Sequence, residues 1–194
     1  MQQVRSFVAI ELSQPIKESL SSIMSKLQPA RHPYVKWVAP GGIHLTLKFL
    51  GNIYADQVPG ITEAIASASR GISPFKIQLG TTGAFPNLQQ PRVIWVAVTG
   101  DVKQLKVMQQ DIDTALSHFG FPVEKRPFKP HLTLGRLKER ASPAERGKIG
   151  KLVAAVMLDG GPSMEVKEIS LMRSTLMPSG AVYDRLSAID LKGR

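Results

Sequence analysis

The chain has 194 residues, contains no cysteine and carries a formal net charge of +10 at pH 7. The missing cysteines exclude disulfides, thiolate metal ligands and a cysteine nucleophile, and no apolar run reaches the ~18 residues that a membrane span requires. The positive charge favours anionic partners such as nucleic acid or phosphate esters, although a basic surface kept for solubility would explain the charge equally well. The N-terminus does not resemble a signal peptide, so we expect a cytoplasmic protein with no membrane contact.

The first half of the chain is predicted to combine two helices with several short strands. Alternating side chains predict a strand over 4–12, and Ser13 is the expected N-cap of a helix that ends near Leu27. The apolar positions of this helix recur at helical spacing: Ile16, Leu20, Ile23, Met24 and Leu27. Further strands are predicted at 35–38, 43–50, 75–82 and 92–98, and a second helix at about 56–70.

The second half repeats this order. Asp101 is the expected cap of a long helix that stops at Gly120. A strand is predicted at 131–137, and Ser142-Pro143 starts a helix that runs to about residue 158. Strands at 164–173 and 182–191 close the chain. We therefore predict an internal duplication.

One tetrapeptide supports the duplication. His-Leu-Thr-Leu occurs at 44–47 and again at 131–134, 87 residues later, and the chain has only four histidines. At ordinary composition, the odds of such a match by chance are roughly one in a thousand. In a strand, the His and the Thr of each copy share one face while the two leucines face the other.

We accordingly predict an α+β fold. Residues 1–194 are expected to form a single domain of two interleaved lobes, each carrying one His-x-Thr motif. The lobes would be related by a pseudo-twofold axis, with mostly antiparallel sheets and outer helices around a central cleft. Equivalent strands would then face one another across that cleft.

Two histidines on opposite walls can act as base and acid in an attack on phosphorus. The hydroxyls of Thr46 and Thr133 can donate hydrogen bonds to the non-bridging phosphate oxygens. A zinc site needs at least three protein ligands, and neither motif supplies a third, so we expect no metal. A single strand histidine is usually structural, and the catalytic interpretation rests on the repetition. We expect His32 to lie on the surface and His118 to be structural, near a helix end.

The motifs resemble the paired signatures of the two-histidine phosphoesterase superfamily, and within it the RNA 2′,3′-cyclic phosphodiesterases, also called 2′-5′ RNA ligases. The resemblance spans nearly the whole chain, including segments 5–9, 35–38, 83–86, 91–96 and 174–186 as well as the extended motifs 44–51 and 130–136. One departure is Gly41-Gly42-Ile43, where the family more often has a Glu-Asn-Leu type of segment.

The resemblance implies hydrolysis of RNA 2′,3′-cyclic phosphate ends to 2′-phosphomonoesters without metal or cofactor. By family analogy His44 protonates the departing 3′-oxygen and His131 activates water, although both have the same sequence neighbours and symmetry leaves the order open. Reverse 2′-5′ ligation would follow from microscopic reversibility. The implied partners are RNA with cyclic phosphate ends, such as tRNA fragments, or cyclic nucleotides, bound by a monomer.

Further substrate-binding residues are expected around this pair. Arg126 and Arg136, within a basic segment from 125 to 140, are candidates for phosphate contacts. The side that Arg136 faces depends on whether a bulge intervenes, because it lies an odd number of residues from Thr133. Candidates for base stacking or cleft lining are Phe49, Trp37, Phe128 and Tyr183.

Three of the aromatic candidates could instead have a purely structural role. Trp37 and Phe49 lie in apolar strands and would more often belong to the core, and Tyr183 could simply pack. Two other functions remain open: an RNA-binding module without catalysis, and a phosphodiesterase for a small nucleotide such as an ADP-ribose cyclic phosphate.

Overall fold

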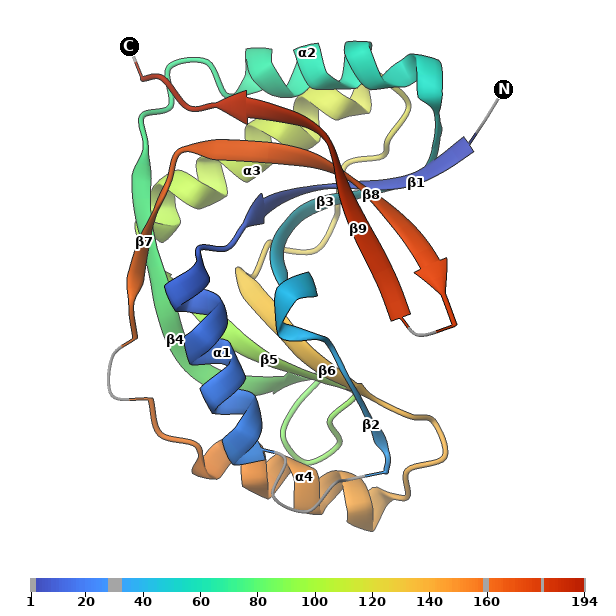
Figure 1. Cartoon of the computed structure of the whole chain (residues 1–194), viewed down its shortest axis with the longest axis vertical. Helices are drawn as coiled ribbons and strands as arrows, with labels where there is room; N and C mark the ends of the chain where they lie inside the picture. Colours follow the sequence, from blue (N-terminus) through green and yellow to red (C-terminus); the bar gives the residue numbers. More distant parts are fainter. Residues whose placement is uncertain (1–2, 28–32, 159–160, 179, 194) are drawn as a thin grey trace.

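The computed structural model describes residues 3–27, 33–158, 161–178 and 180–193 (Figure 1). In chain order the elements are β1 (Gln3–Glu11), α1 (Gln14–Leu27), β2 (Val35–Trp37), the 3₁₀ turn η1 (Pro40–Gly42), β3 (His44–Tyr54), the 3₁₀ turn η2 (Ala55–Gln57), α2 (Val58–Ala68), β4 (Phe75–Phe85), β5 (Val93–Gly100), α3 (Val102–Ser117), β6 (His131–Leu137), α4 (Pro143–Ala155), β7 (Ser163–Val166), β8 (Glu168–Met177) and β9 (Gly180–Asp190). The expected loop at 29–33, together with His32, lies almost entirely outside the described residues.

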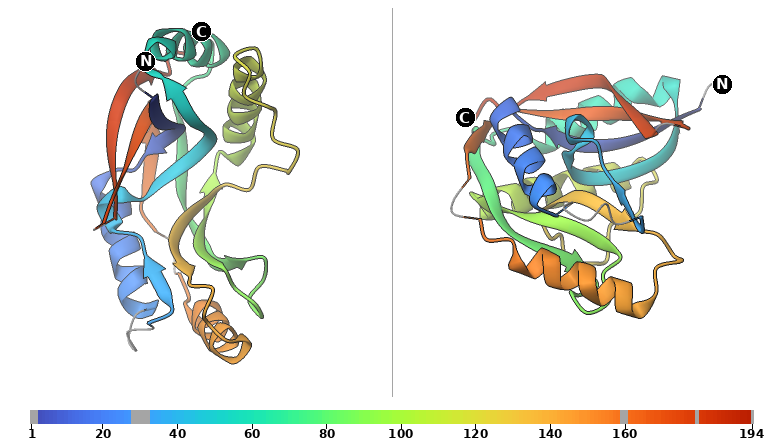
Figure 2. Two further views of the ribbon diagram at one scale, coloured as in Figure 1. Left: turned by 90° about the vertical axis from the view of Figure 1, so that its right-hand side faces the viewer. Right: turned by 60° about the horizontal axis from the view of Figure 1, so that its bottom comes forward.

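Two sheets form the centre of the molecule. One has the strand order β3-β1-β8-β9 and the other β2-β6-β5-β4-β7. Every strand pairing in the described residues is antiparallel. The sheets contact each other through β3 and β6, the two strands that begin with the His-Leu-Thr-Leu motifs. In the left view of Figure 2, the helices α1 to α4 lie toward the outside of the molecule. The predicted α+β architecture is confirmed.

The two halves of the chain exchange strands. The C-terminal strands β8 and β9 join β1 and β3, whereas β2 from the N-terminal half pairs with β6. Each sheet therefore contains strands from both halves and carries one motif. The two motif strands therefore lie in sheets to which both halves of the chain contribute strands.

The apolar side chains predicted from periodicity form the core. All five apolar positions of α1, from Ile16 to Leu27, are buried. Both leucines of each motif are buried as well, as expected for strands whose other face carries His and Thr. At the start of α4, Ser142 Oγ accepts a hydrogen bond from Glu145 N at 3.3 Å, and Ser142 N donates to Glu145 Oε2 at 2.7 Å. The predicted helix start is therefore a capping box.

Some predicted boundaries were wrong. Residues 164–173 were expected to form one strand, but β7 pairs with β4 in one sheet and β8 pairs with β1 in the other. The alternation of apolar and polar side chains does not show where a chain leaves one sheet and enters the other. β3 also continues to Tyr54 instead of ending at Gly51, since Gly51 adopts a φ of 71° beside a register shift and the pairing with β1 resumes. The predicted helix at 56–70 is divided into η2 and α2.

Within the described ranges, none of the helices combines the length and apolar character needed to cross a membrane.

Candidate active site

His44 and His131 open onto the same cleft. The cleft has a volume of about 1380 Å³, and its lining includes both histidines and both motif threonines, Thr46 and Thr133. His44 lies at the start of β3 in the four-stranded sheet, and His131 lies at the start of β6 in the five-stranded sheet. The two copies of the motif therefore line one cavity from two sheets.

The two imidazoles are held in the same way. His44 Nδ1 lies 2.9 Å from the carbonyl oxygen of Gly42, and His131 Nδ1 lies 2.7 Å from that of Lys129. A carbonyl oxygen can only accept, so each Nδ1 carries the proton and donates. In the neutral rings Nε2 is then left with a free lone pair, which is the form needed to accept a proton.

Aromatic rings fix the orientation of each imidazole. His44 stacks on Phe7 with ring centroids 4.5 Å apart and meets the edge of Tyr183 at 4.9 Å. His131 lies edge-on to Phe85 at 5.0 Å and near Trp95 at 6.4 Å. These contacts restrict ring rotation and exclude water from part of each ring.

The chain's departure from the expected sequence before His44 has a structural counterpart. Gly42 lies against Tyr183, and a Cβ at Gly42 would approach the Tyr183 ring to 3.2 Å. The same glycine supplies the carbonyl that accepts the His44 hydrogen bond. A side chain at position 42 would displace the Tyr183 ring, which contacts His44. Glycine at this position therefore allows Tyr183 to pack against His44.

Both histidines are shifted toward the neutral form, but their charged neighbours differ. Burial lowers the pKa of the His44 imidazole, while the hydrogen bond to Gly42 and the negative charge of Glu11 oppose that change. Burial also lowers the pKa of His131; there the hydrogen bond to Lys129 opposes the shift and the positive charge of Arg136 adds to it. Charge therefore favours a protonated His44 relative to His131.

Both motif strands carry a bulge at the same place. Across β3 and β1, Thr46 pairs with Ala9 and Lys48 with Val8, which leaves Leu47 as the extra residue. Across β6 and β5, Thr133 pairs with Trp95 and Gly135 with Ile94, which leaves Leu134 extra. A bulge reverses the alternation of faces beyond it. This is how Phe49 and Arg136, three residues beyond each threonine, come to line the cleft.

Of the remaining aromatic candidates, three line the cleft and one does not. Phe49 lines the cleft with 67% of its surface exposed, so its assignment to the core is wrong. Tyr183 and Phe128 also line the cleft. Trp37 instead packs against the hydrophobic core and is not among the cleft-lining residues, which contradicts its proposed role in base stacking.

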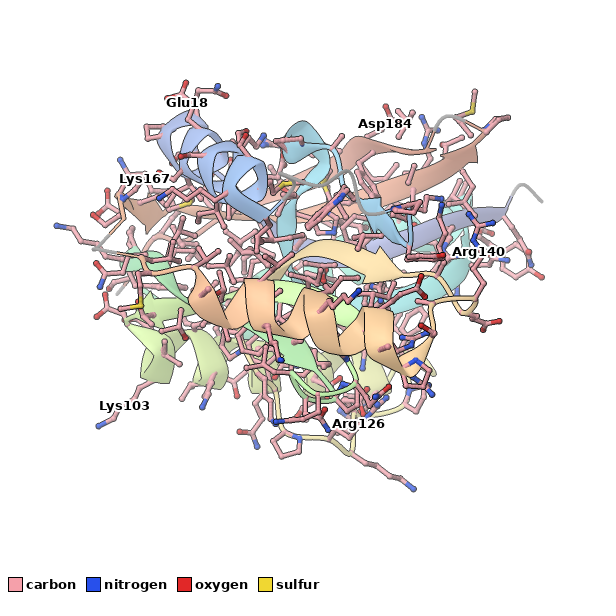
Figure 3. All side chains as sticks on the ribbon, turned by 90° about the horizontal axis from the view of Figure 1, so that it is seen from below. Glu18, Lys103, Arg126, Arg140, Lys167 and Asp184 are labelled. Carbon is pink, nitrogen blue, oxygen red and sulfur yellow. The ribbon has the colours of Figure 1, made fainter. Side chains whose placement is uncertain are left out.

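Arg126 lies on the loop between α3 and β6 (Figure 3). It is among the residues that line the cleft. It pairs with Glu124 at 3.3 Å on the surface. Arg140, from the same basic segment, instead places its guanidinium 5.9 Å from the Tyr34 ring centroid. His118 caps the C-terminus of α3, away from the cleft lining, as expected for a structural residue.

Several residues of the cleft were not singled out from the sequence. Arg5, Arg92 and Lys129 line it in addition to the two predicted arginines, and Phe7 and Phe85 contact the histidines. Arg5 and Arg92 lie far from either motif in sequence and have no spacing signal. In the sequence, only the resemblance of segments 5–9 and 91–96 to the family points to these two arginines.

The described residues contain no group of three or more His, Cys, Asp or Glu side chains arranged to hold a metal ion. The polar groups nearest the histidines in the motifs are hydroxyls. The arrangement can thus offer two imidazoles for proton transfer, two hydroxyl donors and several cations to a phosphate ester.

Comparison with known proteins decides the family. The family model described as LigT like Phosphoesterase matches the chain twice in succession, over residues 10–95 and 96–183. The chain belongs to the LigT-like phosphoesterase family. The double match divides it into the two halves that the repeated motif predicted.

Relatives and solved structures agree with this assignment. A relative from Methanothermobacter thermautotrophicus, named RNA 2′,3′-cyclic phosphodiesterase, is 33% identical over 97% of this chain and 100% of its own length. One from Thermotoga maritima with the same name is 31% identical over 98% and 97%. The crystal structure of a protein from Thermus thermophilus matches with a TM-score of 0.76 and 28% identity, covering 97% of this chain and 98% of that one.

The crystal structure of E. coli LigT complexed with 3′-AMP also matches, with a TM-score of 0.76 and 24% identity over 98% of this chain and 99% of that chain. At this identity the match shows the common fold alone. As a member of the LigT-like phosphoesterases, the protein is an enzyme that acts on phosphate esters.

Proposed function

We propose that this protein hydrolyses RNA 2′,3′-cyclic phosphate ends to 2′-phosphomonoesters, without a metal ion, by acid/base catalysis at His44 and His131. The observation that carries the proposal is the matched setting of the two imidazoles. Each has Nδ1 bound to a backbone carbonyl, and both line one cleft. The relatives named RNA 2′,3′-cyclic phosphodiesterase, about a third identical over their full length, support the substrate class.

In the proposed reaction, neutral His131 accepts a proton from water as the water oxygen forms a bond to phosphorus. The bond from phosphorus to the 3′-oxygen breaks, and protonated His44 donates its Nε2 proton to that oxygen. The product keeps its phosphate on the 2′-oxygen. Glu11 near His44 and Arg136 near His131 support this order, because they favour the charge state that each role requires.

The threonines and the cations would act on the phosphate itself. Thr46 and Thr133 each lie two residues from a histidine on the same strand face, and both line the cleft. Their hydroxyls can donate to the non-bridging oxygens, where charge accumulates in the transition state. Arg136 and Arg126 are proposed phosphate contacts, and Phe49 and Tyr183 proposed contacts to the base.

The same residues would permit ligation, in which the 5′-hydroxyl of a second RNA end takes the place of water as the nucleophile and a 2′-5′ bond joins the two strands. Both histidines come from one chain, so the proposal needs only a monomer. Monomeric state, cytoplasmic location, the identity of the RNA and the single-domain organisation of residues 1–194 as two interleaved lobes remain predictions.

The test is incubation of the protein with an RNA oligonucleotide ending in a 2′,3′-cyclic phosphate, in the presence of EDTA. We expect hydrolysis at the same rate as without EDTA, and a product with its phosphate on the 2′-oxygen. Tight binding without turnover would instead indicate an RNA-binding module. A 3′-phosphate product, or loss of activity on chelation, would contradict the proposed chemistry.

A further inference from the structure

The hairpin formed by β8 and β9 leaves large apolar side chains uncovered at its end. Leu176 is 67% exposed, Met177 49% and Val182 50%. The closed end of this hairpin projects beyond the neighbouring strands β1 and β3 (Figure 1). An apolar side chain left exposed beside a cleft can contribute to a binding surface, so the face on which each of these residues lies is decisive.

The two faces of this hairpin differ in what they meet. The strands pair in regular register here, with Leu176 opposite Ala181 and Ser174 opposite Tyr183. All four of these residues line the cleft, whereas Met177 and Val182 do not. Paired residues of an antiparallel ladder share a face. One face of the hairpin therefore continues the wall that carries Tyr183, and the other faces away.

The cations of the cleft come mainly from the other half of the site. Arg92, Lys129 and Arg136 lie on or beside β5 and β6, and Arg126 lies on the loop that precedes β6. On the side of the hairpin, the cations of the lining are Arg5 and Lys48, and Lys48 is paired with Asp113. The apolar and aromatic residues there are Phe7, Phe49, Leu176, Ala181 and Tyr183. A polynucleotide presents phosphates along one side and base planes along another, which matches this division.

The size of the cleft also favours a polymer. Sites for drug-sized molecules usually measure about 300–1,000 Å³, whereas this cleft measures about 1380 Å³. The catalytic pair needs only the terminal nucleotide. The cyclic phosphate is the 3′ end of its strand, so any further nucleotides must extend in the 5′ direction from it.

We propose that the cleft face of the β8–β9 hairpin, formed by Leu176 and Ala181 beyond Tyr183, binds the bases of the nucleotides that precede the cyclic phosphate. The substrate of the proposed hydrolysis is then an RNA strand and not a cyclic mononucleotide or another small nucleotide. This inference rests on the proposed function. Contact with base faces through apolar side chains tolerates any sequence, because every base has an apolar face.

The experiment compares kcat/KM for a cyclic-phosphate-ended oligonucleotide and for a cyclic mononucleotide in three proteins: wild type, Leu176→Ser and Met177→Ser. The two variants alter neighbouring exposed residues on opposite faces of one hairpin. We expect wild type to prefer the oligonucleotide, and Leu176→Ser to lose about five- to ten-fold on it with little change on the mononucleotide. Met177→Ser should match wild type on both substrates.

A second pair of variants tests the same surface with charge. Ala181→Glu places a carboxylate on the cleft face, and Val182→Glu places one on the outer face, so both lower the net charge by the same amount. We expect Ala181→Glu to weaken oligonucleotide turnover most at low salt, where repulsion of phosphates is least screened. Val182→Glu should have a much smaller effect.

The outcomes separate the two proposals. If wild type turns over neither substrate, the proposed function fails. If wild type turns over both equally, or if Leu176→Ser keeps the full preference for the oligonucleotide, the proposed function stands and the role of the hairpin is refuted. Equal losses in Leu176→Ser and Met177→Ser would also refute it, because they would indicate a general loss of structure.

Discussion

Lys48 of β3 and Asp113 of α3 form an ion pair that is buried between the first motif and the loop leading to the second. Lys48 Nζ also donates to the carbonyl oxygen of Pro122 at 2.8 Å, and Asp113 Oδ2 accepts from Glu124 N at 2.9 Å. From the same helix, Gln109 Nε2 donates to the carbonyl of the bulge residue Leu47 at 3.3 Å. This set of contacts ties the bulge in β3 to the loop that carries Arg126.

Replacing Lys48 by Met should strongly destabilise the protein, because it leaves the Asp113 carboxylate buried without its partner. Breaking one side of a buried pair typically costs about 3–5 kcal/mol. The free energy of unfolding, measured by urea denaturation, gives the comparison. Lys48→Met combined with Asp113→Leu should recover a large part of that loss, since no buried charge then remains.

The exposed pair Lys167–Glu165 supplies a control. Its atoms are 3.1 Å apart, but its side chains are 70% and 44% exposed. Lys167→Met should therefore change the unfolding free energy by less than about 1 kcal/mol. Equal effects at Lys48 and Lys167 would show that the buried pair does not hold the loop as we infer.

His44→Ala and His131→Ala should each lower kcat on a cyclic-phosphate-ended RNA by about 10²–10⁴-fold, the usual contribution of a general acid or base. RNA affinity, measured by fluorescence anisotropy, should stay within a few-fold of wild type, because the cations of the cleft remain in place. His118→Ala, at the end of α3, should keep wild-type turnover. Normal activity in either motif variant would refute the assignment of roles.

The dependence of kcat/KM on pH should be bell-shaped, because one imidazole must be charged and the other neutral. The acidic limb reflects protonation of the base, and the alkaline limb reflects loss of the proton from the acid. Burial lowers the pKa of both His44 and His131. Both limbs should consequently lie on the acid side of the ordinary histidine range, as macroscopic values of the pair.

Changing Glu11 tests which limb belongs to His44. The negative charge of Glu11 raises the pKa of the His44 imidazole against the effect of burial. Glu11→Gln should therefore move the limb of His44 to lower pH. If His44 is the acid, the alkaline limb of kcat/KM shifts; a shift of the acidic limb would reverse the assigned roles.

Arg136→Ala should raise KM for the RNA and reduce the dependence of KM on salt concentration, because a cation on the cleft wall would be lost. The bulge at Leu134 is what places Arg136 there. Arg140→Ala removes the same charge from a residue that contacts Tyr34, and it should have a smaller effect. Steady-state kinetics at two salt concentrations distinguish these outcomes.

The sequence by itself determined the features that depend on local patterns. The repeated His-Leu-Thr-Leu words placed both histidines at strand starts with buried leucines behind them, and the structure has β3 and β6 beginning there. The helix ending at Leu27 and the Ser142 cap were likewise predictable. Such features follow from side-chain spacing and from hydrogen bonds between residues a few positions apart.

Other features were decided only by the tertiary structure. The bulges at Leu47 and Leu134 show only in the pairing with β1 and β5, and they bring Phe49 and Arg136 into the cleft. Packing between distant elements likewise puts Glu11 near His44 and buries Lys48 against Asp113. Register and burial of this kind depend on which strand lies alongside. The two motifs are identical, but a residue distant in the chain decided the charge near His44, and the pairing of β6 with β5 decided that Arg136 lines the cleft with His131.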